Sequence, residues 1–162
     1  MTAKSKFAPG TRWREKLERD HSKVVELPPK MAGRFGAGTM LIPKPRDVDA
    51  LIRKAGSGKL ISVSQIRKKL AADNHAAVTC PLTTGIFIRI SAEAAEEDLR
   101  NGKKRITPYW RVVRDDGSLL EKLPGGVQAQ AQKLKQEGHQ IEAGRGKKPP
   151  RVIEIAKRLV RL

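Results

Sequence analysis

The stretch Leu60–Ile90, LISVSQIRKKLAADNHAAVTCPLTTGIFIRI, carries the strongest fold signal in this chain of 162 residues. Either Ser62 or Ser64 is placed to cap a helix whose side chains Ile66 and Leu70 lie four residues apart on one face. The pattern therefore predicts a short amphipathic helix that packs through this face.

A second helix is predicted to follow the turn at residues 73–75. It opens at Thr79 and has Pro81 in its first turn, where the missing N–H costs little. We expect its buried stripe to consist of the apolar residues at a spacing of four, namely Leu82, Ile86, Ile90 and Ala94. The acidic run at residues 93–98 reads as a solvated face. Two helices joined by a short turn are typical of a helix-turn-helix.

The segments on either side complete the predicted fold. Pro45 starts a helix upstream, and Asp-Asp-Gly at 115–117 lies between the apolar segments 110–113 and 118–120, which favours a hairpin. A further helix runs from about Val127 to Glu137 and ends at Gly138. The sequence thus predicts a mainly α fold with a small β-hairpin, arranged as a winged helix-turn-helix.

Composition suggests three parts. Residues 1–40 read as a basic, partly disordered N-terminal extension, because residues 31–39 are rich in glycine. Residues 41–142 hold the winged helix-turn-helix domain, and residues 143–162 form a basic C-terminal extension that begins with a Gly/Pro-rich loop.

The charge balance points to an anionic partner. The chain has 34 Lys+Arg against 17 Asp+Glu, a formal net charge of +17, and nucleic acid is the leading class of partner, with mere solubility as the alternative. No run approaches about 20 apolar residues, so we expect no membrane span. A single cysteine and three scattered histidines predict no disulfide, metal or cofactor. We expect a cytoplasmic, nucleoid-associated monomer.

Several separated segments, in the same order, together resemble the DNA-binding domain of the O6-alkylguanine-DNA alkyltransferase family. They cover about residues 45–140. The segments are Leu51–Lys54, Gly58–Ser62, Gln65–Ile66, Thr83–Gly85, Pro108–Val112, Asp116–Gly117, Gly125–Gly126, Leu134 and Glu137–His139. In this resemblance, Pro108-Tyr109-Trp110-Arg111-Val112 stands where the family has Pro-Cys-His-Arg-Val.

The departures from the family pattern imply a protein without catalysis. Tyr109 replaces the cysteine whose thiolate attacks the alkyl carbon, and Trp110 replaces the general-base histidine. Val63 aligns with the base-flipping tyrosine, Pro81 with the arginine finger, and Glu137 with the glutamate of the missing relay. With an aromatic residue at the cysteine position, the chain resembles a distant relative of one subgroup, the alkyltransferase-like proteins, which bind O6-alkylguanine without repairing it and flag it for repair.

The resemblance and the charge pattern together nominate two sets of residues. The predicted DNA contacts are Thr79, Pro81, Thr83, Thr84, Lys103, Lys104, Arg105 and Arg111. The predicted base pocket consists of Val63, Tyr109 and Trp110. For the two aromatic residues a structural role in the core stays open, Arg111 could instead orient a neighbouring loop, and the run 103–105 could be a solvated loop.

We therefore expect a duplex DNA-binding alkyltransferase-like protein, with DNA and possible repair proteins as partners. Two alternatives stay open. The first is a nucleic-acid-binding regulator on the same scaffold without lesion recognition. The second is a methyltransferase that uses a nucleophile foreign to the family, for which Cys80 at a helix N-terminus is the candidate, although a small half-buried structural cysteine is the simpler interpretation.

Overall fold

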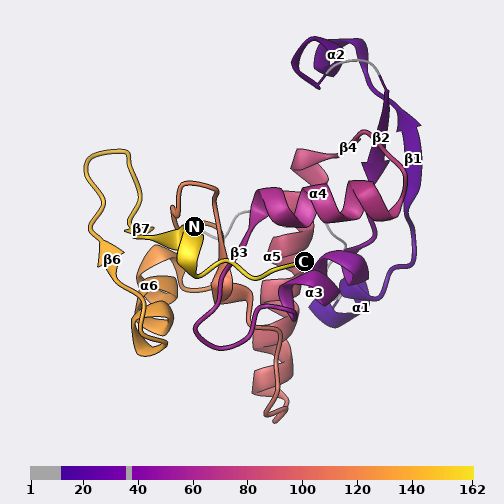
Figure 1. Ribbon diagram of the computed structural model, residues 1–162. Coiled ribbons are helices and arrows are strands. Elements are labelled where there is room, and N and C mark those ends of the chain that lie inside the picture. The colour runs from indigo at the N-terminus through magenta and orange to yellow at the C-terminus, as the bar shows by residue number, and fades with distance from the viewer. Residues whose placement is uncertain (1–11, 36–37) are drawn as a thin grey trace.

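The computed structural model describes residues 12–35 and 38–162. Helices dominate this part of the chain, and three small sheets join them (Figure 1). The helices are α1 Trp13–Leu17, α2 Pro29–Phe35, α3 Pro45–Ile52, α4 Val63–Asp73, α5 Pro81–Arg100 and α6 Gly126–Gln136. The strands are β1 Lys23–Glu26, β2 Thr39–Ile42, β3 Ile61–Ser62, β4 Val78–Thr79, β5 Val112–Val113, β6 Ile141–Glu142 and β7 Arg151–Val152.

The predicted pair of helices with a turn between them is present as α4, β4 and α5. Helix α4 begins at a capping box, in which the Ser62 hydroxyl accepts from the Gln65 N–H at 3.0 Å and the Gln65 side chain accepts from the Ser62 N–H at 2.9 Å. The connection to α5 is locked because the Thr79 hydroxyl donates to the Arg67 carbonyl while the Arg67 Nε donates to the Thr79 carbonyl. The angle between the helices is thus held by side chains as well as by the turn.

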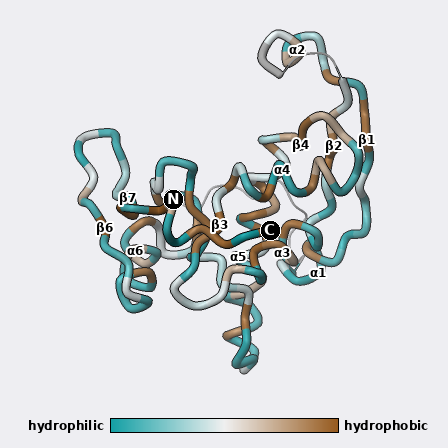
Figure 2. Tube along the Cα trace, in the orientation of Figure 1, coloured by the Kyte–Doolittle hydropathy of each residue, from teal (hydrophilic) through white to brown (hydrophobic). Residues whose placement is uncertain are grey.

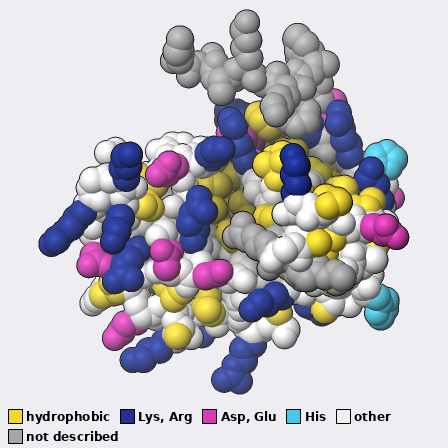
Figure 3. All heavy atoms as spheres, turned by 90° about the horizontal axis from the view of Figure 1, so that it is seen from above, with side chains coloured by type: hydrophobic (Ala, Val, Ile, Leu, Met, Phe, Trp, Pro, Cys, Tyr) yellow, Lys and Arg dark blue, Asp and Glu magenta, His cyan; other side chains and the backbone are white. Residues whose placement is uncertain are grey.

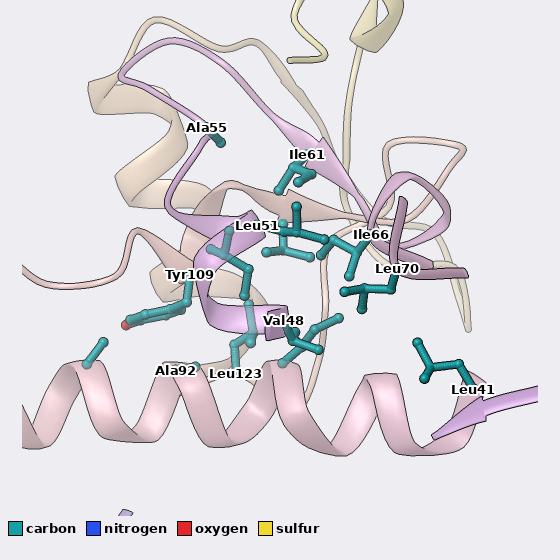
Figure 4. Close-up of a cluster of buried hydrophobic side chains, with 14 residues drawn as sticks. Leu41, Val48, Leu51, Ala55, Ile61, Ile66, Leu70, Ala92, Tyr109 and Leu123 are labelled. Carbon is teal, nitrogen blue, oxygen red and sulfur yellow. The ribbon is translucent and has the colours of Figure 1, made fainter. Parts of the chain in front are cut away.

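The main core lies between α5 and the two helices α3 and α4 (Figure 4). Val48 and Ile52 of α3 and Ile66 of α4 are fully buried against this helix, and Tyr109 lies in the same cluster. Hydrophobic colours follow β3 and the inner side of the helices in Figure 2. Burying aliphatic side chains of this size stabilises the fold by roughly 1.5–3 kcal/mol each.

Two of the four residues that were predicted to form the buried stripe of α5 are exposed. Ile90 and Ala94 are buried, but Leu82 is 75% exposed and Ile86 is 41% exposed. The face that packs on α3 and α4 includes the fully buried Thr84, together with Ile88, Ala92 and Ala95. A threonine and alanines at these positions allow a close approach of the neighbouring helices, whereas the larger apolar residues of the first two turns face outward.

The acidic run at residues 93–98 is not a solvated face. Glu97 accepts from the backbone N–H of Trp13 at 3.0 Å, and Asp98, which is 5% exposed, accepts from Arg14. Leu17 of α1 packs with Ile90 and Ala94 of α5. The carboxylates therefore anchor α1 on the C-terminal half of α5.

The small sheets differ from the predicted hairpin. Strand β5 pairs in parallel with β3, through Ile61 opposite Val112, rather than with residues 118–120. The Asp-Gly turn itself forms, since the Gly117 N–H donates to the Arg114 carbonyl at 2.9 Å. The hairpin predicted over 110–120 is therefore wrong as a strand pair, and the winged arrangement stays a prediction.

An antiparallel hairpin does form further along the chain, between β6 and β7. Its second strand is held to the turn at residue 117, because the Val152 N–H donates to the Gly117 carbonyl at 2.9 Å. The segment that follows returns to the start of α4, where the Val160 carbonyl accepts from the Gln65 side chain at 2.7 Å. The described residues of the predicted C-terminal extension thus pack on the rest of the protein.

The described residues of the predicted N-terminal extension also make contacts with the rest. Strand β1 pairs with β2 in antiparallel register, and β2 pairs in parallel with β4. Part of the segment predicted as a linker forms helix α2. The predicted disorder of residues 1–10 lies outside the described residues, and the division of the chain at residues 40 and 142 stays a prediction.

Candidate nucleic-acid interface

The first turn of α5 exposes two predicted contact residues, Pro81 and Thr83, and their neighbour Leu82 to solvent. Leu82 is largely exposed, Pro81 and Thr83 are partly exposed, and the Thr83 hydroxyl lies 3.1 Å from the Cys80 thiol sulfur. The helix is 20 residues long, which corresponds to about 30 Å. Its N-terminal N–H groups therefore carry the positive end of a substantial helix dipole at this surface.

Two of the predicted DNA contacts are internal. Thr79 is 1% exposed and Thr84 is 0% exposed. Their hydroxyls donate to the carbonyls of Arg67 and Cys80 at 2.8 and 2.7 Å. Because both side chains are buried and hydrogen-bonded, we correct the prediction for these two residues: they hold the helix-turn-helix together and do not face a ligand.

The tip of the β6–β7 hairpin carries a compact group of cations, which we call the basic tip and define as Arg145, Lys147 and Lys148. Reciprocal backbone bonds of 3.1 and 2.9 Å between Arg145 and Lys148 close a tight turn in which Gly146 has a φ of 56°. All three side chains are exposed, and none of them forms an ion pair with any described residue.

The backbone under the basic tip is closely packed. A Cβ on Gly144 would lie 2.5 Å from the Lys148 carbonyl oxygen, so only glycine fits at this position. Pro149 and Pro150 restrict the other strand, and the Pro150 carbonyl accepts from the Leu119 N–H at 2.9 Å. The turn is therefore preorganised and presents its cations in a fixed arrangement.

The basic tip and the start of α5 lie on the same side of the protein. In Figure 1 both lie on the upper side, with part of α4 between them. Figure 3 looks onto this side and shows Lys and Arg side chains spread over it, with Asp and Glu side chains among them on the left. The exposed cations of the hairpin and the N-terminus of α5 therefore lie on one side of the protein, separated by part of α4.

The other predicted cations lie elsewhere. Lys103, Lys104 and Arg105 follow the C-terminal end of α5, about 30 Å along the helix from its first turn. Lys104 and Arg105 line an open cleft of about 360 Å³ together with Arg53, Trp110 and Arg111. The structure therefore separates the predicted DNA contacts into two groups at opposite ends of α5.

Tyr109, one of the residues of the predicted base pocket, is buried and holds two elements together. Its side chain is 2% exposed, and its hydroxyl donates to Glu96 of α5 at 2.6 Å. Burial raises the pKa of the phenol strongly, and the Glu96 hydrogen bond and charge raise it further. The phenol is thus kept protonated at neutral pH and accounts for the packing of the 3-10 turn Tyr109–Arg111 on α5.

Arg111 and Trp110 are both tied to Glu137. The Arg111 guanidinium makes a bidentate pair with the carboxylate, with contacts of 2.6 to 3.0 Å, and donates to the Ala55 carbonyl at 2.7 Å. The Trp110 indole donates to the same carboxylate at 3.2 Å. Burial raises the pKa of Glu137, but these hydrogen bonds outweigh it and keep the pKa below its ordinary value. Of the two roles left open for Arg111, the orientation of a neighbouring loop matches these contacts.

The predicted base pocket is not assembled as an open site at Tyr109. Val63 and Trp110 are only partly buried and pack against the same core cluster, but the Tyr109 ring is enclosed and lies edge-on to Trp110 with 5.4 Å between ring centroids. Since the chain forms a 3-10 turn here rather than a strand, both aromatic rings lie close together. They contribute packing at this point and do not leave an exposed aromatic face on Tyr109.

Sequence reasoning left the basic tip out of the candidate site. The sequence does show a run of cations between Gly144 and Pro150, but this run was as compatible with a solvated loop as with a DNA contact. Among the described residues no group of three or more His, Cys, Asp or Glu side chains could hold a metal ion. No helix in this part of the chain is long and apolar enough to cross a membrane.

Comparison with models of protein families finds no match, and a search of curated proteins finds none either. Among solved structures, the crystal structure of S. pombe Atl1 in complex with damaged DNA containing O6-carboxymethylguanine aligns with a TM-score of 0.48 and 16% sequence identity. The alignment covers 73% of this chain and 94% of that chain. At this identity and TM-score the likeness assigns no function to this protein.

Proposed function

We propose that this protein binds duplex DNA as an alkyltransferase-like protein without an acceptor cysteine, through the side that carries the first turn of α5 and the basic tip. The observation that carries the proposal is the basic tip itself: three exposed cations without ion pairs to described residues, on a closely packed turn that lies on the same side of the protein as the exposed N-terminus of α5. Phosphates are the ligand that such a surface attracts without reading a sequence.

The charge distribution supports a partner that is a polyanion. The acids of the described residues are largely engaged within the protein, as Glu137, Asp98 and Asp49 are with Arg111, Arg14 and Arg53. Much of the positive charge that results from 34 Lys+Arg against 17 Asp+Glu is therefore free to attract an anionic ligand. A small anionic ligand would not need a positive surface that extends from α5 to the hairpin.

The order of family-like segments in the sequence supports the more specific part of the proposal, which is recognition of an alkylated base for repair. On this interpretation the protein marks the lesion for repair proteins in the cytoplasm, acts as a monomer, and transfers no alkyl group. The buried Tyr109 favours a second candidate, a DNA-binding regulator on the same scaffold, because its enclosed ring offers no face on which an extruded base could stack.

The test is a paired binding assay with two duplexes of the same sequence, one of which contains O6-methylguanine. Fluorescence anisotropy at fixed salt gives both affinities. Tighter binding to the alkylated duplex supports lesion recognition, and equal binding supports the regulator. Absence of binding to both duplexes at 50 mM salt would overturn the proposal. Mass spectrometry of the protein after incubation tests the enzyme alternative, since a transferred methyl group would remain on the protein, at Cys80 or elsewhere.

A further inference from the structure

The cleft at the far end of α5 has the chemistry of a second binding site. It lies between the loop after α3, from which Arg53 and Gly56 line it, and the loop after α5, from which Lys104 and Arg105 line it. Its volume of about 360 Å³ falls at the lower end of the range of small-molecule sites. A ligand the size of one nucleotide matches this space.

The cations of this cleft are available to a ligand. Lys104 and Arg105 are exposed and have no ion pair or hydrogen bond with any described residue. Arg53 uses only its Nε to reach Asp49, at 2.9 Å, so its two terminal nitrogens have no described partner. No acidic side chain lines the cleft, although two of its arginines, Arg53 and Arg111, pair with Asp49 and Glu137.

Backbone donors add to these cations. The N–H groups of Gly56, Lys104, Arg105 and Ile106 donate to no described acceptor. Backbone N–H groups combined with arginine and lysine form the common environment of phosphate oxygens in proteins. The donor set therefore suits a phosphate better than a single carboxylate.

An apolar wall completes the cleft. Ile106, Pro108 and Trp110 line it beside the cations. The indole is held in place because its N–H donates to Glu137 and its ring contacts the Lys133 ammonium at 4.8 Å from the centroid. A rigid aromatic ring next to a phosphate site is the arrangement on which nucleobases stack.

We propose that this cleft binds a nucleotide, with the phosphate held by Lys104, Arg105 and Arg53 and the base against Trp110. The phosphate ester belongs either to a free mononucleotide or to an unpaired nucleotide of a nucleic-acid strand. The site is separate from the duplex-binding surface at the other end of α5 and does not rest on the function proposed for that surface.

The chain offers a specific reporter for this site. It has two tryptophans, and Trp13 lies on α1, so the W13F variant leaves the Trp110 indole as its only source of tryptophan emission. In this background, 2′-deoxyadenosine 5′-monophosphate and a single-stranded oligonucleotide are titrated separately, with 2′-deoxyadenosine as the control without a phosphate. Inorganic phosphate serves as the competitor.

We expect the mononucleotide, the strand, or both to quench the Trp110 emission. The ligand that quenches at the lower concentration identifies the source of the phosphate. K104S/R105S should weaken the quenching at least tenfold, whereas the charge-matched control K23S/K30S, at exposed lysines of β1 and α2 that do not line the cleft, should leave it unchanged. Quenching that survives K104S/R105S, equal quenching by deoxyadenosine, or no quenching by either phosphate ligand at 10 mM nucleotide would overturn the inference. A protein that fails to bind duplex DNA but shows this quenching rejects only the function proposed for the α5 surface.

Discussion

Replacing Glu137 by glutamine tests whether its buried ion pair with Arg111 stabilises the fold. The Arg111 guanidinium and the Glu137 carboxylate are 14% and 13% exposed and form a bidentate pair. E137Q keeps the shape of the side chain but removes its charge, which leaves the guanidinium largely buried without a counter-charge. Breaking a buried pair in this way costs about 3–5 kcal/mol.

The expected loss is large enough for a simple assay. For a protein of this length, each kcal/mol corresponds to about 2–4 °C in Tm, so E137Q should lower the Tm by about 6–20 °C in differential scanning calorimetry. The control is E154Q, whose partner Lys157 is 3.9 Å away and whose side chains are 72% and 79% exposed. It should change the free energy of unfolding by less than about 1 kcal/mol.

The pH dependence gives a second readout of the same contact. Because the pKa of Glu137 is lower in the folded protein than in the unfolded chain, its stabilising contribution is present above the ordinary carboxyl pKa and is lost as the pH falls through the folded value. The stability difference between wild type and E137Q should therefore shrink in acid. An E137Q variant as stable as E154Q at pH 7 would refute the structural role that we assign to the pair.

Three further outcomes are expected. T79V should lose about 1–3 kcal/mol in urea denaturation, because the Arg67 carbonyl loses its buried hydroxyl donor, and an unchanged midpoint would contradict the lock between α4 and α5. L82A should leave stability within about 0.5 kcal/mol, since Leu82 is 75% exposed, yet weaken duplex binding several-fold in anisotropy; equal affinity would remove the first turn of α5 from the interface. Burial lowers the pKa of His139, so wild-type stability should fall as the pH drops below about 6.5, and H139F should lack that part of the decline.

Local signals in the sequence predicted helices α4 and α5. Ser62, with Gln65 three residues later, specifies the start of α4, and Pro81 specifies the start of α5. Both signals act through neighbouring residues, and the packing of the helices is compatible with them. The same holds for Gly138, whose positive φ ends α6. The start and end of a helix depend on neighbouring residues, and these are visible in the sequence.

Pairings between distant segments were not visible. Strand β5 pairs with β3, some 50 residues earlier in the chain, and the apolar pattern of Val112-Val113 says nothing about which partner it takes. The acidic run at residues 93–98 looked solvated because one of its partners, Trp13 of α1, lies 84 residues away from Glu97 in the sequence, and the other, Tyr109, lies beyond the end of α5. Leu82 and Ile86 matched a buried stripe, but Thr84 and Ile88 occupy the core instead.

In the candidate site too, the sequence indicated residue types but not how the residues lie relative to one another. The sequence identified polar residues at the start of α5 and cations at residues 103–105, and it nominated both groups as DNA contacts. The 20 residues of α5 place the two groups at opposite ends of the helix. Thr79 and Thr84 have the small polar side chains typical of a DNA-reading helix, although both are internal. The basic tip could be preferred over a solvated loop only once its reciprocal hydrogen bonds and its position on the same side as the start of α5 were known.

The salt dependence of duplex binding tests the central claim most directly, in two variants that each remove three charges. R145S/K147S/K148S alters the basic tip, and K103S/K104S/R105S alters the loop beyond the other end of α5. Each lost phosphate contact lowers the slope of log K against log salt by about 0.9, so the tip variant should lose up to about 2.7 from the wild-type slope between 50 and 200 mM salt. The loop variant should keep the wild-type slope. A loop variant with the reduced slope and a tip variant with the wild-type slope would contradict the assignment of duplex binding to the side of the basic tip.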